Sequence, residues 1–160
     1  MSGVHVHLLL NHVPILGTLF ALALLAYGAW RGSRDLLRVS WTAFVALWLI
    51  AIPVFKSGEP AEDAVAKRPE VSQQLIDDHE HLAKRAMASN TLLVAVSVVA
   101  LWSTRGGRTA PGWLLGASLL AAAVTFGLMA GTGNLGGQIR HAEVRPGAAS
   151  NQPPTAETDR

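Results

Sequence analysis

Residues 8–30, LLLNHVPILGTLFALALLAYGAW, carry no charged side chain. A helix needs about 20 predominantly apolar residues to cross the hydrocarbon core of a bilayer, so this segment is long enough to span it. Three more uncharged runs follow, at 39–55, 86–103 and 113–130. Core helices of soluble proteins are rarely uncharged on every face. The sequence therefore predicts an all-α fold, an integral membrane four-helix bundle formed by residues 1–145.

The short loops between the runs predict the orientation. Arginine gathers in the loop after the first run, at Arg31, Arg34 and Arg38, and in the loop after the third, at Arg105 and Arg108. An excess of basic residues in short loops marks the cytoplasmic side. We therefore expect a multi-pass protein of the bacterial inner (cytoplasmic) membrane, with both termini and the 56–85 connection on the outer, periplasmic side. No Lys or Arg precedes the first run, which favours a retained helix over a cleaved signal peptide.

The polar residues before the third run predict an outer helical segment over 69–85. Pro69 suits a first helical turn, and the segment continues without a break into the third span. Leu75, His79, Leu82, Ala86 and Leu93 recur at helical spacing, with Ser89 completing a stripe that should face other helices. The last residues, 146–160, are rich in Pro, Ala and polar residues, and we expect a disordered tail there.

The chain contains six histidines, and the predicted topology places all of them on the outer side. Histidine is the commonest metal ligand, and it is costly in lipid without a partner. Helical phasing predicts that His5 and His81 are solvated, whereas the other four, His7, His12, His79 and His141, point inward. His7 and His12 lie five residues apart, which separates them by about 140° and about 7.5 Å on a helix. They are therefore expected to serve two different sites.

Two further elements lie near these histidines. In SGEPAED (57–63), Glu59 and Glu62 are candidates to orient a ligating histidine by accepting its hydrogen bond, or to act as proton acceptors. The alternative is that they belong to a solvated turn. In GTGNLGGQIRH (131–141), Gly136 and Gly137 would allow a flat macrocycle to approach the backbone, or else they break the helix. Arg140 is a candidate partner for haem propionates or for lipid headgroups.

The composition excludes several kinds of chemistry. The chain has no cysteine, which excludes disulfides, thiolate zinc sites, ordinary iron–sulfur clusters and covalent c-type haem attachment. It contains neither a glycine-rich nucleotide loop nor a basic–aromatic patch, so no nucleic-acid partner is expected.

Four phrases together resemble a known family. HLLLNHVPILG (7–17), SGEPAED, a histidine–glutamate pair before the third span and GTGNLGGQIRHAEVR (131–145) are similar to an uncharacterised bacterial four-span membrane protein family. Related families of this kind are proposed to be b-type cytochromes. The resemblance covers most of residues 5–145. It implies that the motif positions of the family include His7, His12, His79, His141, Glu59, Glu62 and Glu80.

These observations predict a membrane-bound haem b electron-transfer subunit with one or two bis-histidine haems and no catalytic residues of its own. It would relay electrons between quinone and a periplasmic electron carrier, together with other subunits of a membrane redox complex. Two alternatives remain open. One is a non-haem metal site built from His12, His79 and His141 with Glu59 or Glu62. The other is a structural or assembly subunit without a cofactor.

Overall fold

The computed structural model describes residues 10–58, 66, 71–141 and 145. The regular elements in this part of the chain are all helical: α2 (His12–Arg31), α3 (Arg34–Lys56), α5 (Gln73–Ser103), the short 3-10 turn η1 (Arg105–Gly107) and α6 (Gly112–Arg140). The four α-helices are each long and apolar enough to cross a membrane. The predicted all-α fold with four helices of membrane-spanning length and apolarity is therefore confirmed.

Several sequence predictions fall on residues outside the described part. They concern the two histidines before α2, the carboxylates of SGEPAED, the first residues of the predicted outer helix and the tail, that is His5, His7, Glu59, Glu62, Pro69 and 146–160. Those predictions stay as they stand.

Local signals explain where the helices begin and end. The hydroxyl of Ser33 accepts a hydrogen bond from the Leu36 amide at the start of α3, and Gly32 ends α2 in a left-handed conformation with φ of 63°. At the start of α5, the Ser72 hydroxyl accepts from the Leu75 amide at 3.3 Å. Ser72 is thus the N-cap of α5, which begins at Gln73, within the predicted outer segment 69–85.

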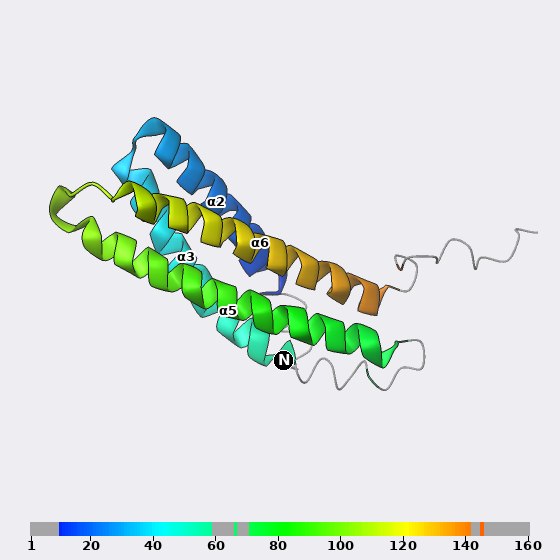
Figure 1. Ribbon diagram of the computed structural model, residues 1–160. Helices are drawn as coiled ribbons and strands as arrows, with labels where there is room; N and C mark the ends of the chain where they lie inside the picture. The colour runs from blue at the N-terminus through cyan, green and yellow to red at the C-terminus, as the bar shows by residue number, and fades with distance from the viewer. Residues whose placement is uncertain (1–9, 59–65, 67–70, 142–144, 146–160) are drawn as a thin grey trace, which may run out of the picture.

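The helices differ in length. At 1.5 Å per residue, α2 is about 30 Å long, whereas α5 with 31 residues and α6 with 29 reach about 45 Å. Figure 1 shows α5 and α6 side by side, extending together beyond α2 and α3. The glycine-rich segment 131–137, considered as a helix-breaking loop, instead continues α6 to Arg140.

Packing places the helices in a ring. α2 lies against α3 and α6, and α5 lies against the same two helices, so α2 and α5 are diagonal to one another. The core combines large apolar side chains with buried polar ones. Trp41, which is fully buried, donates its indole N–H to the Ser118 hydroxyl at 3.1 Å, and the hydroxyls of Ser89 and Thr125 are 2.8 Å apart. Such bonds between helices compensate for the absence of water in a bilayer.

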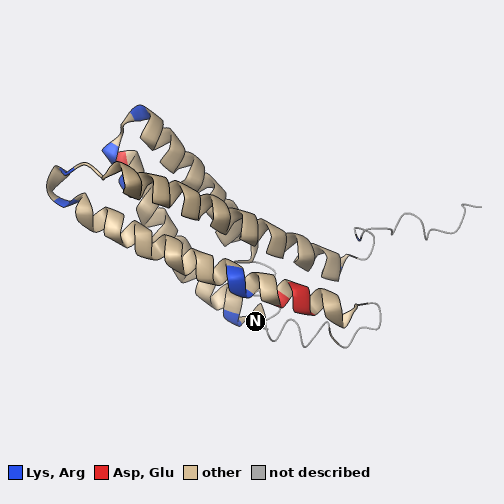
Figure 2. Ribbon diagram, viewed as in Figure 1, with Lys and Arg blue, Asp and Glu red and all other residues tan. Residues whose placement is uncertain are grey.

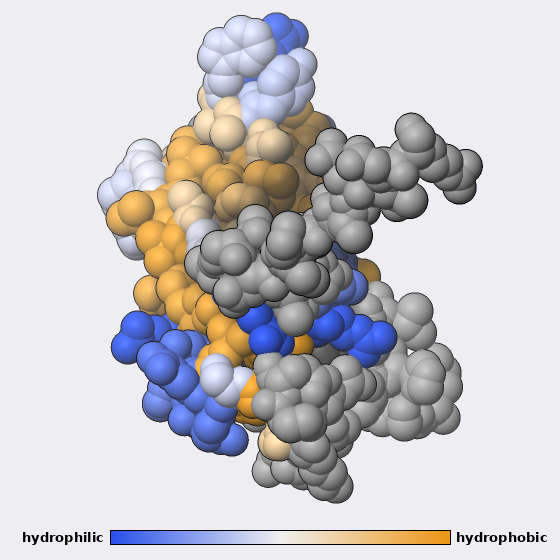
Figure 3. Space-filling model, turned by 90° about the vertical axis from the view of Figure 1, so that its right-hand side faces the viewer, coloured by the Kyte–Doolittle hydropathy of each residue, from blue (hydrophilic) through white to orange (hydrophobic). Residues whose placement is uncertain are grey.

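The outer surface of the bundle is apolar. Phe20, Leu92 and Leu120 are each more than 60% exposed. On the face shown in Figure 3, hydrophobic residues occupy the middle and hydrophilic residues gather above and below them. A soluble protein does not expose so large an apolar surface. This surface is what a multi-pass membrane protein presents to lipid.

The two ends of the bundle are chemically different. The α2–α3 turn and the α5–α6 connection form one end, which we call the arginine end because it carries the arginines of both loops (Figure 2). Three strongly exposed tryptophans lie at this end, Trp30, Trp102 and Trp113. Tryptophan is enriched where a protein crosses the membrane–water interface. The exposed rings therefore mark the level of that interface.

Candidate functional site

The four described histidines lie at the opposite end, which we call the histidine end. His12 begins α2, His79 and His81 lie in the first turns of α5, and His141 follows α6. The antiparallel connections between the helices bring these three segments to one end of the bundle. Segments separated by 60 residues or more in sequence therefore supply histidines to a common region.

His79 is the best-positioned of them. Its side chain is half-buried between α5 and α6, and its Nδ1 lies 3.0 Å from the backbone carbonyl oxygen of Thr132. A carbonyl oxygen only accepts hydrogen bonds, so in this contact Nδ1 of a neutral imidazole donates and Nε2 carries the lone pair. This is the tautomer with which histidines commonly ligate a metal, and the bond to the carbonyl fixes the orientation of the ring.

The glycines of α6 make room for this side chain. A Cβ added to Gly136 would lie 3.3 Å from Cε1 and 3.6 Å from Nδ1 of His79, and one added to Gly131 would lie 2.9 Å from Leu82. In the described structure, side chains of α5 thus occupy the space beside these glycines in which a macrocycle was expected. Gly137 has no such neighbour; its carbonyl oxygen accepts the His141 amide at 2.8 Å and caps the helix.

The prediction that His12 points inward is wrong, because its side chain is exposed. The preceding residue takes the inward position: Asn11 is half-buried, and its Oδ1 is buried without a hydrogen-bond partner. Pro14 and Thr18 continue the buried face of α2. Contacts with α3 and α6 decide which residues of α2 are buried. The buried side cannot be predicted from the sequence, because this helix is apolar on every side.

Two contacts nevertheless place His12 at the height of His79. Gly133 of α6 packs against Ile15 of α2, since an added Cβ would lie 2.9 Å from Ile15 Cδ1. Three residues further along α6, Gly136 meets His79. Because α2 and α6 are antiparallel, His12, three residues before Ile15, lies level with Gly136. The two histidines therefore lie within about one helical turn of the same height, on diagonal helices.

The end of α6 lies further out. His141 follows Gly136 by five residues, which corresponds to about 7.5 Å along a helix. Its side chain and that of Arg140 are exposed, so the predicted inward position of His141 is also wrong in the described structure. Because α6 ends at Arg140, helical spacing no longer determines the direction of the His141 side chain. Ile139, in contrast, is buried and anchors the last turn.

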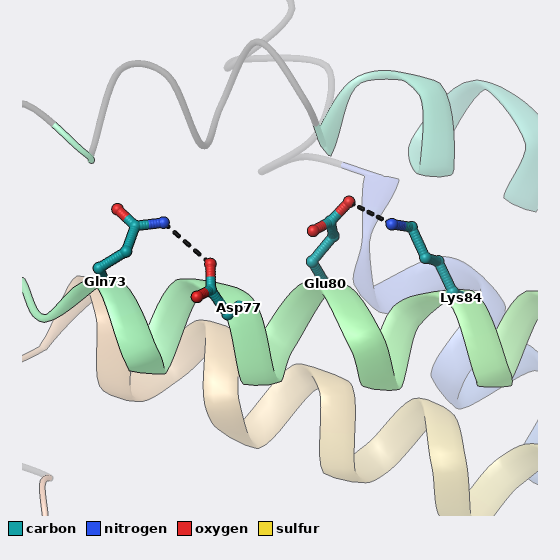
Figure 4. Close-up of polar contacts among 4 residues, drawn as sticks. All are labelled: Gln73, Asp77, Glu80 and Lys84. Atoms are coloured by element: carbon teal, nitrogen blue, oxygen red, sulfur yellow. Dashed lines mark hydrogen bonds and ion pairs between the residues drawn. The ribbon is translucent and has the colours of Figure 1, made fainter.

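Glu80 forms an ion pair with Lys84 on the same helix. Figure 4 shows this pair beside a second one, in which Gln73 donates to Asp77 at 2.9 Å. Both pairs join residues four positions apart on the outer side of α5. For the His79 ring, the Thr132 carbonyl is a hydrogen-bond acceptor within reach.

The predicted stripe of α5 is confirmed. Its members are all buried or half-buried: Leu75, His79, Leu82, Ala86, Ser89 and Leu93. His81, which was predicted to be solvated, is exposed. Sequence reasoning missed Asn90, which is 1% exposed and has a buried Nδ2 without a hydrogen-bond partner. An amide in the middle of an apolar span was the available signal. Thr132 gave no signal, because its backbone oxygen makes the contact.

In the part of the chain that the structure describes, no three His, Cys, Asp or Glu side chains lie close enough together to hold a metal ion. A closed non-haem site built from described residues alone is therefore not formed in this conformation. No family model, no curated protein and no solved structure matches this chain.

Proposed function

We propose that this chain is a membrane-bound electron-transfer subunit that binds haem b without a covalent bond, at the histidine end of the bundle. The observation that carries this proposal is the contact between His79 Nδ1 and the Thr132 carbonyl. It holds a half-buried imidazole in the tautomer required for ligation through Nε2. The carbonyl also makes the imidazole a better electron donor to iron.

The chemistry of the donor side chains fits such a group. Neutral imidazole is an ordinary axial ligand of haem iron, and the chain has no cysteine that would favour a covalent or iron–sulfur centre. Haem b supplies one-electron chemistry when it is bound. His79 would hold the haem iron, and the half-buried Leu82 and the buried Ile139 would help to keep water away from it on the bundle side.

Ligation by a second histidine would favour electron transfer over oxygen chemistry. His12 is the first candidate because it lies at the height of His79. Because the His12 side chain is exposed, it would have to rotate at the start of α2 to reach the haem iron. His141 and His7 are the other candidates, and a second bis-histidine pair would use the two that remain.

The position of this site suggests its partners. With the arginine end in the cytoplasm, the histidine end faces the periplasm, so we infer electron exchange between membrane quinone and an outer-face carrier, within a larger complex. The chain would contribute the relay, and catalysis would belong to other subunits.

The test is the absorption spectrum of the chain purified in detergent after expression with excess haem. We expect a Soret band and a pyridine haemochrome spectrum of haem b. His79→Ala should abolish the band, whereas the control His81→Ala, which removes an exposed histidine two residues away, should keep it. Among His7→Ala, His12→Ala and His141→Ala, the variant with a high-spin spectrum identifies the second ligand. A well-folded wild-type chain without a Soret band would refute the proposal.

One observation favours a second candidate, a structural subunit without a cofactor. The His79–Thr132 contact by itself ties α5 to α6. In that case His79→Asn, which retains a short donor, would preserve thermal stability in detergent better than His79→Ala, and neither variant would alter an absorption band. Elemental analysis of the same samples tests the non-haem alternative, which predicts stoichiometric metal without porphyrin.

A further inference from the structure

The arginine end contains a cavity of about 400 Å³ between the start of α3 and the α5–α6 connection. Four arginines and one carboxylate line it: Arg34, Arg38, Arg105, Arg108 and Asp35. In the described part of the chain, Asp35 forms no ion pair with any of them. The cavity therefore has an excess of positive charge that no described residue neutralises.

Two of these arginines shape the cavity. Arg34 donates to the carbonyl of Gly107, and Arg38 donates to the hydroxyl of Thr104 at 2.9 Å and to its carbonyl at 3.3 Å. The connection can fold back over α3 because Gly106 and Gly107 adopt positive φ angles of 67° and 80°. These bonds secure the wall of the cavity.

The other two arginines are available to a ligand. Arg105 and Arg108 are exposed, and neither guanidinium has a hydrogen bond or ion pair with a described residue. A guanidinium matches a phosphate group in geometry and charge, because it presents several N–H donors in a planar fork. The cavity thus has the chemistry of a phosphate site.

An apolar groove, also about 400 Å³, adjoins this cavity. Thr42 and Val45 of α3 line one side, and Val98, Val99, Leu101 and Trp102 of α5 line the other. Arg105 lines both the groove and the cavity, so the two meet at its side chain. The exposed ring of Trp102 places their junction at the membrane interface, which is the depth of lipid headgroups.

We propose that the cavity and the groove together bind one phospholipid with an anionic headgroup. The phosphate lies among the arginines, and an acyl chain lies in the groove between α3 and α5. A free phosphate ion would use only the cavity, and a zwitterionic lipid would leave the positive charge uncompensated. Anionic lipid is the one occupant that matches both parts. This site is independent of the haem proposal, because it lies at the other end of the bundle.

The test measures binding of dioleoyl phosphatidylglycerol and of dioleoyl phosphatidylcholine to the detergent-purified full chain by native mass spectrometry. We expect phosphatidylglycerol to bind at least tenfold more tightly. A basic residue near a membrane contributes about 1 kcal/mol to anionic lipid binding, so Arg105→Gln should weaken binding about fivefold. The matched control is Arg31→Gln, which removes an equal charge at the same end outside the cavity and should change binding less than twofold.

A second variant separates lipid from free phosphate. Val99→Trp fills the groove with a side chain that points toward lipid, so it should weaken phosphatidylglycerol binding and leave the fold intact. Equal binding of the two lipids would overturn the proposal, as would equal effects of Arg105→Gln and Arg31→Gln. It would also fail if inorganic phosphate displaced phosphatidylglycerol fully while Val99→Trp had no effect, since the occupant would then be the free ion.

Discussion

The contact between α2 and α3 at Gly28 gives a sharp test of the packing. A Cβ added to Gly28 would lie 2.9 Å from Leu36 Cβ and 3.2 Å from the backbone nitrogen of Leu37. Non-bonded carbons prefer separations of about 3.5 to 4.0 Å, so the new methyl group would overlap Leu36 by roughly 0.6 to 1.1 Å. Rotation of a side chain cannot relieve this overlap, because the atoms involved belong to the α3 backbone or are attached to it directly. The two helices must therefore move apart.

The magnitude follows from two opposing effects. Overpacking of this kind costs about 1 to 3 kcal/mol, whereas replacing a helical glycine by alanine gains about 0.8 to 1.0 kcal/mol of helix propensity. Gly127→Ala is the matched control, because no atom lies within 4 Å of a Cβ at that position of α6. Both variants share the gain in propensity. The difference in unfolding free energy between them, about 1 to 3 kcal/mol, therefore reports the overlap at Gly28 alone.

The assay is reversible unfolding in mixed micelles with increasing SDS, followed by the fluorescence of the five tryptophans. We expect Gly28→Ala to unfold at lower SDS than wild type, and Gly127→Ala to unfold at equal or higher SDS. If Gly28→Ala were as stable as Gly127→Ala, the close crossing of α2 and α3 would be refuted, along with the height relations among helices that depend on such contacts.

Three further predictions concern the core and the lipid-facing surface. Asn90→Leu should leave stability unchanged or raise it by about 1 kcal/mol in the same SDS assay, because a buried donor without a partner is costly. The control is Asn134→Leu, at an exposed position. If Asn90→Leu lost over about 1 kcal/mol more than this control, the amide would have a partner. Trp41→Phe and Ser118→Ala should show a coupling of about 0.5 to 1.5 kcal/mol in a double-mutant cycle, as expected for one buried hydrogen bond; additive effects would contradict the contact. Leu120→Arg should lower the membrane-inserted fraction measured by carbonate extraction, since arginine in a span costs about 2.5 to 3.5 kcal/mol on insertion scales, whereas Leu120→Ala should insert almost normally.

Charge and hydropathy alone predicted the four helices. Whether a segment can cross a bilayer depends on its own length and apolarity, and these are local properties of the chain. The stripe on α5 was also predictable, because polar residues before the span reveal which side of the helix is buried. The same reasoning identified His79 as inward and His81 as solvated, and both assignments agree with their burial.

The phase of the most apolar helix was not predictable. Residues 12–31 have no polar side to contrast with an apolar one, so sequence spacing did not reveal that Asn11 points inward and His12 outward. The end of α6 posed a similar problem. A run with several glycines looks like a break, yet the helix continues to Arg140 because Gly131 and Gly133 are packed closely against side chains of α5 and α2.

By itself, the sequence determined that this protein has four apolar helices, no thiol chemistry and histidines gathered at one end. Only the tertiary structure decided which atoms meet there. The backbone oxygen that orients His79 comes from Thr132, 53 residues away, and the arginine cavity needs the start of α3 to meet the α5–α6 connection. Composition is a property of each segment, whereas a site is a property of contacts between segments, and those contacts exist only once the helices have packed.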